Sequence, residues 1–264
     1  MAKNNYTLGR GQLYLSELDG DQNPGSQRYV GNSVDFNINV ETETLDHTDP
    51  DQGVNQIDAS VQTSVTRTGT LTLDDIQREN LALFFFGTEQ SSAQSADSSN
   101  QTFTIPAAHI ADLIKRVEND AWYQIGVSAS NPSGIRGLGE IASVGSLTVD
   151  TDYEVDLPRG RIRLKDTTAV KALTGSLVVT YKRAERTLNQ VISGSAPKQV
   201  MLKFFEDNPE GEDRTWTLPV VALSPSGEMA LKGAEWRQIP FSLSIQVPAT
   251  TGVAAIYIDD KPVE

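Results

Sequence analysis

Two groups of oxygen-bearing side chains are the first candidates for chemistry in this sequence. Residues 19–25 (DGDQNPG) resemble the start of a calcium loop, but Pro24 and Val30 stand where such a loop needs glycine and glutamate. We interpret this segment as a hairpin turn. The second group is Asp46, His47, Asp49 and Asp51. Its spacing follows no metal-ligand rule, so we favour a solvated acidic loop over a metal site.

A run of alternating basic residues is the third candidate. On a strand, alternation places these side chains on one face, opposite Ile162 and Leu164. Such a face can contact an anion or another subunit, but we favour a solvated strand face because exposed charges of this kind usually contribute little. The basic residues are Arg159, Arg161, Arg163 and Lys165.

The residues that enzymes use for nucleophilic and redox chemistry are scarce. The chain has no cysteine and two histidines, and we interpret His109 as a packed or surface residue. No nucleophile elbow, phosphate-binding loop or dinucleotide fingerprint occurs, and the glycines of residues 134–139 have the wrong spacing for one. We therefore expect no enzymatic activity, no cofactor and no bound metal.

Composition and charge define the class of protein. The 264 residues carry a formal net charge of −13, which argues against a surface that grips nucleic acid. The longest apolar runs, Leu81–Phe86 and Val253–Ile258, are too short to span a bilayer, and residues 1–6 show no apolar signal region. These features predict a soluble, intracellularly made protein without membrane contact.

The clearest pattern lies near the N-terminus. Apolar and polar residues alternate over residues 33–41, and again over residues 60–73, which predicts two strands with one buried and one polar face. The buried set would be Val34, Phe36, Ile38, Val61 and Val65. Residues 42–59 between the strands are acidic and contain Pro50 and Gly53, which predicts a long, loose loop.

A helix is predicted directly after the second strand, with Asp74 as its cap and Gln77 as capping-box partner. A second helix is predicted over residues 107–117, and residues 91–100 read as an exposed loop. The C-terminal part returns to strands at residues 199–205, 216–223, 238–247 and 253–258.

The middle of the chain is more balanced in charge and reads as a separate small β unit. Short β-branched or aromatic runs alternate there with turn signals, which is typical of a sandwich. We place this inserted domain at residues 119–183, with 1–118 and 184–264 forming one interrupted domain. Its predicted strands are residues 122–127, 147–149, 153–155, 161–164 and 177–181.

The order of these features resembles the major tail tube protein of long-tailed, siphovirus-type bacteriophages. The segments that carry the resemblance are GRGQLYL at 9–15, DDI at 74–76, ENL at 79–81 and KFFEDNPEG at 203–211. It covers roughly residues 1–90 and 190–264, and residues 150–162 resemble β-domain insertions of phage structural proteins. The resemblance implies a mainly β fold, with a β-sandwich or barrel-like core, a flanking helix and an inserted β-sandwich-like domain.

The resemblance also implies a function and partners. Homohexameric rings would stack into a virion tail tube, assembled in the host cytoplasm, through which DNA passes without specific binding. Tape measure, tail terminator and tail tip proteins are the implied partners. The implied lumen-facing residues are Asp35, Asn37, Asn39, Glu41, Gln62, Ser64 and Thr66. The loop would contact a neighbouring subunit or ring through Leu45, Asp46, Asp49, Asp51, Val54 and Ile57.

An alternative of another class stays open. A β-sandwich that binds carbohydrate or a cell-surface partner would have the same composition and strand pattern. Electron microscopy separates the two hypotheses, because a tube protein forms rings or tubes and a binding module stays dispersed.

Overall fold

The computed structural model describes residues 6–49, 56–250 and 252–260. The chain is mainly β, with several antiparallel sheets and few helices, as the sequence predicts. It divides into two compact units, here called unit 1 (residues 1–90 and 190–264) and unit 2 (residues 91–189). Unit 2 is inserted into unit 1, and it is wider than the predicted interval 119–183 because it also includes the strand and helix of residues 101–115.

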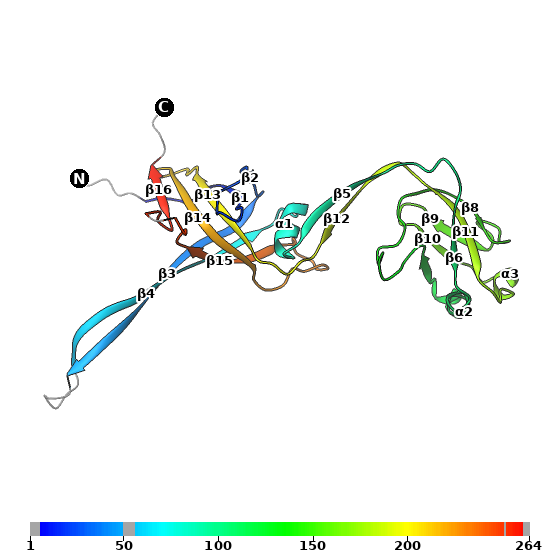
Figure 1. The fold of residues 1–264 in the computed structure, drawn as a ribbon, viewed down its shortest axis with the longest axis horizontal. Helices are drawn as coiled ribbons and strands as arrows, with labels where there is room; N and C mark the ends of the chain where they lie inside the picture. Colours follow the sequence, from blue (N-terminus) through cyan, green and yellow to red (C-terminus); the bar gives the residue numbers. More distant parts are fainter. Residues whose placement is uncertain (1–5, 50–55, 251, 261–264) are drawn as a thin grey trace. The chain divides into compact units, whose positions relative to one another are not determined.

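Unit 1 is built on one antiparallel sheet of eight strands (Figure 1). Its strand order is β2-β1-β13-β14-β15-β4-β3, and β16 pairs with β14. The strands are β1 (Gly11–Glu17), β2 (Arg28–Tyr29), β3 (Ser33–Asp49), β4 (Gln56–Leu73), β13 (Lys198–Glu206), β14 (Arg214–Pro225), β15 (Ile239–Gln246) and β16 (Tyr257–Asp260).

The sheet curls around its own core. Phe36 on β3 and Phe204 on β13 have ring centroids 5.6 Å apart, although four strand spacings separate these strands in the sheet. In a flat sheet that separation would be about 19 Å, since neighbouring strands lie about 4.8 Å apart. The inner face is therefore enclosed by the sheet itself, as in the predicted barrel-like core.

Helix α1 (Arg78–Phe84) packs on this core. The ring of Phe84 meets Phe241 on β15 edge to face at 6.0 Å, and the buried Asn80 donates a hydrogen bond to the carbonyl of Val30. The predicted cap was wrong: the helix begins after Gln77, and the Asp74 carboxylate accepts hydrogen bonds from the Asn32 side chain. Both oxygens of the Asp74 carboxylate accept from Asn32, and no side chain of the described residues caps the backbone N–H groups of the first helical turn.

The predicted loose loop was also wrong. Strands β3 and β4 stay paired through Leu45↔Val61 and His47↔Ala59 to Asp49↔Gln56, so most of residues 42–59 is β structure. Alternating threonines and other β-branched residues favour this extended pairing. We call residues 40–49 and 56–67 the ribbon. It runs out beyond the rest of the sheet of unit 1 (Figure 1), because β15 pairs with β4 only over residues 68–73.

Unit 2 contains two three-stranded antiparallel sheets that share one apolar core. Residues 147–149, predicted as a strand, form isolated bridges instead. The sheets have the orders β6-β11-β8 and β7-β10-β9. Their strands are β6 (Gln101–Ile105), β7 (Trp122–Gln124), β8 (Leu138–Val144), β9 (Tyr153–Asp156), β10 (Arg161–Leu164) and β11 (Leu177–Arg183). The helices are α2 (Ala107–Lys115), α3 (Thr168–Lys171) and the 3-10 turn η1 (Val117–Asn119).

Strands β5 (Thr88–Gln94) and β12 (Arg186–Ile192) pair with each other in a two-stranded sheet, and both unit boundaries fall within them. Residues 91–94 are therefore strand, and the predicted exposed loop is restricted to residues 95–100. The Ser/Gln-rich composition of residues 91–100 did not predict a strand, because the strand that β5 pairs with lies about a hundred residues further along the chain.

Candidate functional site

A polar sheet face collects most of the predicted lumen residues. Two cross-strand rows, Asn37↔Thr70↔Ser242 and Asn39↔Thr68↔Ser244, run over β3, β4 and β15. Alternation places these residues opposite the buried Leu71 and Leu243. The face is rich in hydroxyls and amides, and the described residues of these two rows include no cation. The predicted residues on this face are Asp35, Asn37, Asn39, Glu41, Ser64 and Thr66.

Hydrogen bonds along this face tie its side chains together. The Asn37 amide and the Thr70 hydroxyl donate to the two carboxylate oxygens of Asp35, at 2.6 and 3.1 Å. Further along, the Asn39 amide donates to Glu41 at 2.8 Å, and the Ser64 hydroxyl donates to Glu43 at 3.1 Å. The acidic groups are thus held by neutral donors, and the surface remains neutral to acidic.

Gln62 is an exception to the predicted set. Glu43 pairs with Ser64 and Thr44 pairs with Gln62, so Thr63 is an extra residue in β4, a β-bulge. Because side chains alternate with period two, one extra residue moves everything beyond it to the opposite face. Gln62 therefore shares a face with Thr44, away from Asn37 and Asn39.

The predicted buried set was largely wrong. Phe36 and Ile38 pack against the core, but Val34, Val61 and Val65 are 56%, 63% and 40% exposed. Val34 is itself the extra residue of a bulge between Ser33 and Asp35. The other two valines lie in the ribbon, where no second layer of the described structure covers the strands. For Val65 the predicted face was right, but alternation does not say what packs on it. For Val61 the face was also wrong, because the bulge at Thr63 places Val61 beside Leu45, on the face of Asn37 and Asn39.

The ribbon exposes its apolar side chains. Leu45 and Val61 are cross-strand partners, and they are 69% and 63% exposed. Val40 and Ile57 are more than half exposed as well. A two-stranded ribbon has no core of its own and is marginally stable in water, and its unpaired edges invite further pairing. Of the predicted contact residues, Leu45 and Ile57 lie here, whereas Asp51 and Val54 lie outside the described residues.

The acidic residues of the ribbon make cross-strand hydrogen bonds. The Ser60 hydroxyl donates to Asp46 at 2.6 Å, and Nδ1 of His47 lies 2.5 Å from the Asp58 carboxylate. Asp49 ends β3. Among the described residues, no three His, Asp or Glu side chains are arranged to hold a metal ion.

The basic strand of unit 2 is neutralised by its neighbours. Arg159 and Arg161 each lie 2.9 Å from Asp156, and Lys165 lies 3.1 Å from Glu154. The donated hydrogen bonds hold the pKa of both carboxyls below the usual range, chiefly that from Arg159 to Asp156 and that from Lys165 to Glu154. Arg163 pairs with Glu154 and Asp120, and Arg161 stacks over the Trp122 ring at 4.5 Å.

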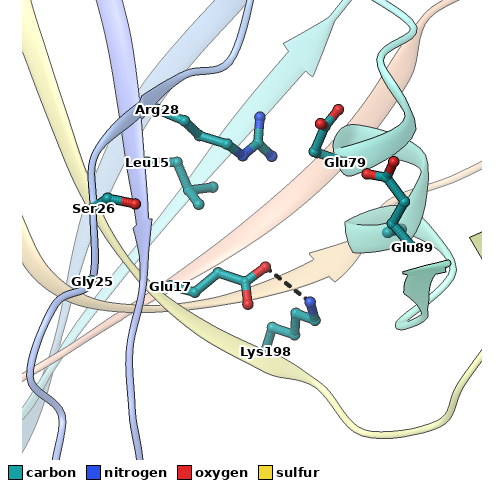
Figure 2. Close-up of a pocket in the computed structure, with 9 residues that line it drawn as sticks. Leu15, Glu17, Gly25, Ser26, Arg28, Glu79, Glu89 and Lys198 are labelled. Atoms are coloured by element: carbon teal, nitrogen blue, oxygen red, sulfur yellow. Dashed lines mark hydrogen bonds and ion pairs between the residues drawn. The ribbon is translucent and has the colours of Figure 1, made fainter. Parts of the chain in front are cut away.

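A pocket of about 350 Å³ lies in unit 1 between β1, β2 and α1 (Figure 2). Arg28 pairs with Leu15 in the sheet, and Figure 2 shows its guanidinium pointing from β2 towards Glu79 on α1. Both terminal nitrogens, Nη1 and Nη2, are buried, and neither has a hydrogen-bond partner among the described residues. Burial lowers the pKa of Arg28, against the opposing effect of Glu79 and Glu17.

The other charged groups of this pocket are already paired. Glu17 lies 2.9 Å from the Lys198 ammonium, and Glu89 lies 3.0 Å from Arg78. Across the part of the chain that the structure describes, the buried end of the Arg28 side chain therefore has no bonded anion, which normally costs free energy. No sequence pattern pointed to this residue, because the pocket is formed by contacts between segments far apart in the chain.

A second hollow, of about 400 Å³, lies in unit 2 beside α2. Its lining includes Trp122, Tyr123 and His109, and Nδ1 of His109 lies 3.1 Å from the Tyr123 hydroxyl. Asp112 and Arg116 on α2, which form an ion pair at 3.1 Å, add polar groups. His109 is thus a surface residue hydrogen-bonded to an aromatic neighbour.

Within the described parts of the chain, no helix has the length and apolar character that a bilayer crossing requires. No curated protein sequence matches the chain. Over residues 6–113, which include the ribbon and Arg28, the chain is similar to a family described as Protein of unknown function UCP028589.

Proposed function

We propose that this chain is a structural protein that assembles into a tube, the tail tube of a long-tailed bacteriophage. Homohexameric rings would stack head to tail, and the tube would conduct DNA during ejection. Tape measure, tail terminator and tail tip proteins would be its partners in the virion tail, after assembly in the host cytoplasm. The proposal rests on the resemblance in sequence and on two surfaces of unit 1.

The ribbon is the observation that carries the proposal. Leu45 and Val61 form an exposed apolar pair on a ribbon that has no layer of its own to cover them. Contiguous exposed apolar surface on a well-folded protein marks an interaction site. A contact between a ribbon and a different surface of a second copy is heterologous, and such contacts generate rings or filaments.

The polar face supports the conduit role. Asn37, Asn39 and their threonine and serine neighbours present hydroxyls and amides, and the nearby acids face no cation on these rows. Duplex DNA carries one negative charge per about 1.7 Å of axis, and cationic walls would bind it by releasing counterions. A neutral to acidic lining avoids this retention.

Electron microscopy and sedimentation of the purified full-length chain test the proposal. We expect rings or tubes to form as the protein concentration rises, with a hexameric repeat. A chain that stays monomeric at all attainable concentrations, with an intact circular dichroism spectrum, would contradict it. The matched control is the same protein with Leu45→Asp and Val61→Asp, which should remain monomeric and folded.

The hollow of unit 2 favours a second candidate function, binding of a carbohydrate. The aromatic rings of Trp122 and Tyr123 can stack against the apolar face of a sugar ring, while Asp112 and Arg116 supply hydrogen-bonding groups. Glycan-array binding by the full chain tests this, with Tyr123→Ala as the comparison. A glycan signal that Tyr123→Ala leaves unchanged would exclude the hollow as its origin.

A further inference from the structure

The unpaired guanidinium of Arg28 calls for a ligand of defined chemistry. A planar guanidinium presents its N–H groups as a fork that matches the two oxygens of a carboxylate. Here Nη1 and Nη2 are both buried and both lack a partner among the described residues, and Arg28 is one of the residues that line a pocket of about 350 Å³. This volume is large enough to admit a side chain.

The charges around the pocket determine whether it attracts or repels an incoming carboxylate. Lys198 neutralises Glu17 and Arg78 neutralises Glu89, which leaves Arg28 facing Glu79. No hydrogen bond joins Arg28 to Glu79, so the cation is not committed to it. The apolar side chains of Leu15 and Ala82 form part of the lining and would cover the carbon atoms of a guest side chain.

The ribbon is an exposed element that combines acidic with apolar side chains. No lysine or arginine occurs between Arg28 and Arg67, while Glu43, Asp46 and Asp58 lie on the ribbon beside its exposed apolar residues. The arginine of the ribbon, Arg67, lies next to Thr68, where the pairing with β15 begins. Beyond it, no lysine or arginine of the ribbon can neutralise these carboxylates. The ribbon is complementary to a pocket that combines a free guanidinium with an apolar wall.

We infer that the Arg28 pocket binds a carboxylate, and that the ribbon of a second copy of this chain supplies it. The inference rests on the proposed function, since it identifies where one subunit receives the ribbon of the next. It also explains the buried unpaired cation of the single chain, which acquires its partner when the subunits associate. Glu79, opposite Arg28, would oppose the incoming carboxylate and thereby limit the strength of the contact.

Association measured by analytical ultracentrifugation tests the inference on the full chain. Arg28→Met removes the charge and should weaken association about tenfold to a hundredfold. Arg28→Lys should recover part of the loss, because an ammonium retains the charge without the fork. Arg159→Met, at an exposed position in unit 2, is the matched control and should associate like the wild type. Circular dichroism verifies that each monomer is folded.

The sign of the effect of Glu79→Gln separates this inference from a simpler pairing within one chain. If a carboxylate enters, removing the opposing charge should strengthen association. If Arg28 instead finds its partner in Glu79 by a side-chain rearrangement, Glu79→Gln should leave association unchanged or weaken it. Either of these results, or normal association of Arg28→Met, would overturn the inference.

A third set of variants identifies the source of the carboxylate. Asp46→Asn combined with Asp58→Asn should weaken association, whereas Asp166→Asn in unit 2 should not. Succinate is the small-molecule probe: it should raise the melting temperature of the wild-type monomer but not that of Arg28→Met. Succinate binding together with normal association of the ribbon variant would assign the pocket to a free carboxylate and refute the second-copy source.

The same probe keeps the two proposals distinguishable. If the wild-type chain never associates, the proposed function fails, and the Arg28-dependent response to succinate still reports on the pocket. If the wild type forms tubes and Arg28→Met forms them equally well, the proposed function is supported and the inference about the Arg28 pocket is refuted.

Discussion

The ribbon of unit 1 and the basic strand of unit 2 place charged side chains on exposed strands in opposite ways. On the basic strand, each arginine lies against a carboxylate of its own unit, and Trp122 covers part of the charge. On the ribbon, the acids have hydroxyl or histidine neighbours, and apolar residues such as Leu45 stay exposed. The basic strand of unit 2 thus has its charges neutralised within its own unit. The ribbon of unit 1 instead leaves apolar side chains exposed, and covering them with a partner would lower the free energy.

Loss of the apolar pair should have the largest effect. Leu45→Asp with Val61→Asp places charges where we expect a partner surface to bury both side chains. Burial of each is worth about 1.5–3 kcal/mol, so association should weaken at least about a hundredfold in sedimentation. The monomer should melt normally, because both positions are already exposed. Val178→Asp, at an exposed valine of unit 2, is the control. An equal loss of association in this variant would mean that the ribbon has no specific role in association.

A change inside unit 2 should affect that unit alone. The buried Asp152 accepts hydrogen bonds from the Thr148 amide at 2.9 Å and the Thr167 hydroxyl at 2.7 Å, and the first of these is the main reason that its pKa is lowered. Asp152→Asn should lower one of two thermal transitions and leave association intact. A single transition that shifts as a whole would mean that the units do not unfold separately.

The same carboxylate gives a pH dependence. Because its pKa is lower in the folded state, the stabilisation is complete above the unfolded value of about 3.9 and is lost as the pH falls through the lower folded value. The wild-type melting temperature of unit 2 should therefore drop below pH about 4, more steeply than that of Asp152→Asn. Parallel curves would contradict the assignment.

Removal of unit 2 should have a smaller effect on assembly than either change to the ribbon. Replacing residues 91–189 by a short Gly/Ser linker joins β5 to β12 where the unit boundaries lie. Since the apolar core of unit 1 contains no residue of unit 2, its melting temperature should be retained. Aggregation or loss of the β-sheet circular dichroism signal would show that unit 1 depends on its insertion.

The smallest effect is expected on the basic strand. Arg159→Gln removes a guanidinium whose side chain is 70% exposed, and exposed ion pairs contribute little. The melting temperature of unit 2 should change by no more than about a degree or two. A larger change, or any loss of association, would mean that this face has a role beyond its own unit.

Local pattern was sufficient for much of the fold. Alternation located β3 and β4, and the spacing of Ile110 and Leu113 located α2. The C-terminal strands predicted at residues 199–205, 216–223 and 238–247 match β13, β14 and β15, whereas the one predicted at residues 253–258 overlaps β16 only at its first two residues. Features that depend on partners far along the chain were not predictable in this way. The pairing of β5 with β12 belongs to this class. The extension of β3 and β4 is a local pairing, and it was missed because the acidic composition with Pro50 and Gly53 was interpreted as a loop.

The candidate site shows the same division. Alternation grouped Asp35, Asn37 and Asn39 on one face, but it gave Gln62 the wrong face because a bulge leaves no mark in composition. The same bulge gave Val61 the wrong face. Val65 was treated as core, since an apolar stripe looks the same whether its own chain or another molecule covers it. The role of Arg28 could not be predicted for a third reason. The absence of a hydrogen-bond partner for its terminal nitrogens, among the residues described, depends on the three-dimensional packing around them, which no local sequence pattern encodes.

The bulge at Thr63 has a consequence for how such a protein can change over generations. A deletion of one codon there would remove the extra residue, and the pairs on both sides of it, Glu43↔Ser64 and Thr44↔Gln62, could stay as they are. Because cross-strand partners share a face, Val61 would still lie beside Leu45. Chains with and without that residue would therefore present the same apolar pair. The length of β4 can vary by one residue at this point while both faces of the ribbon keep their side chains.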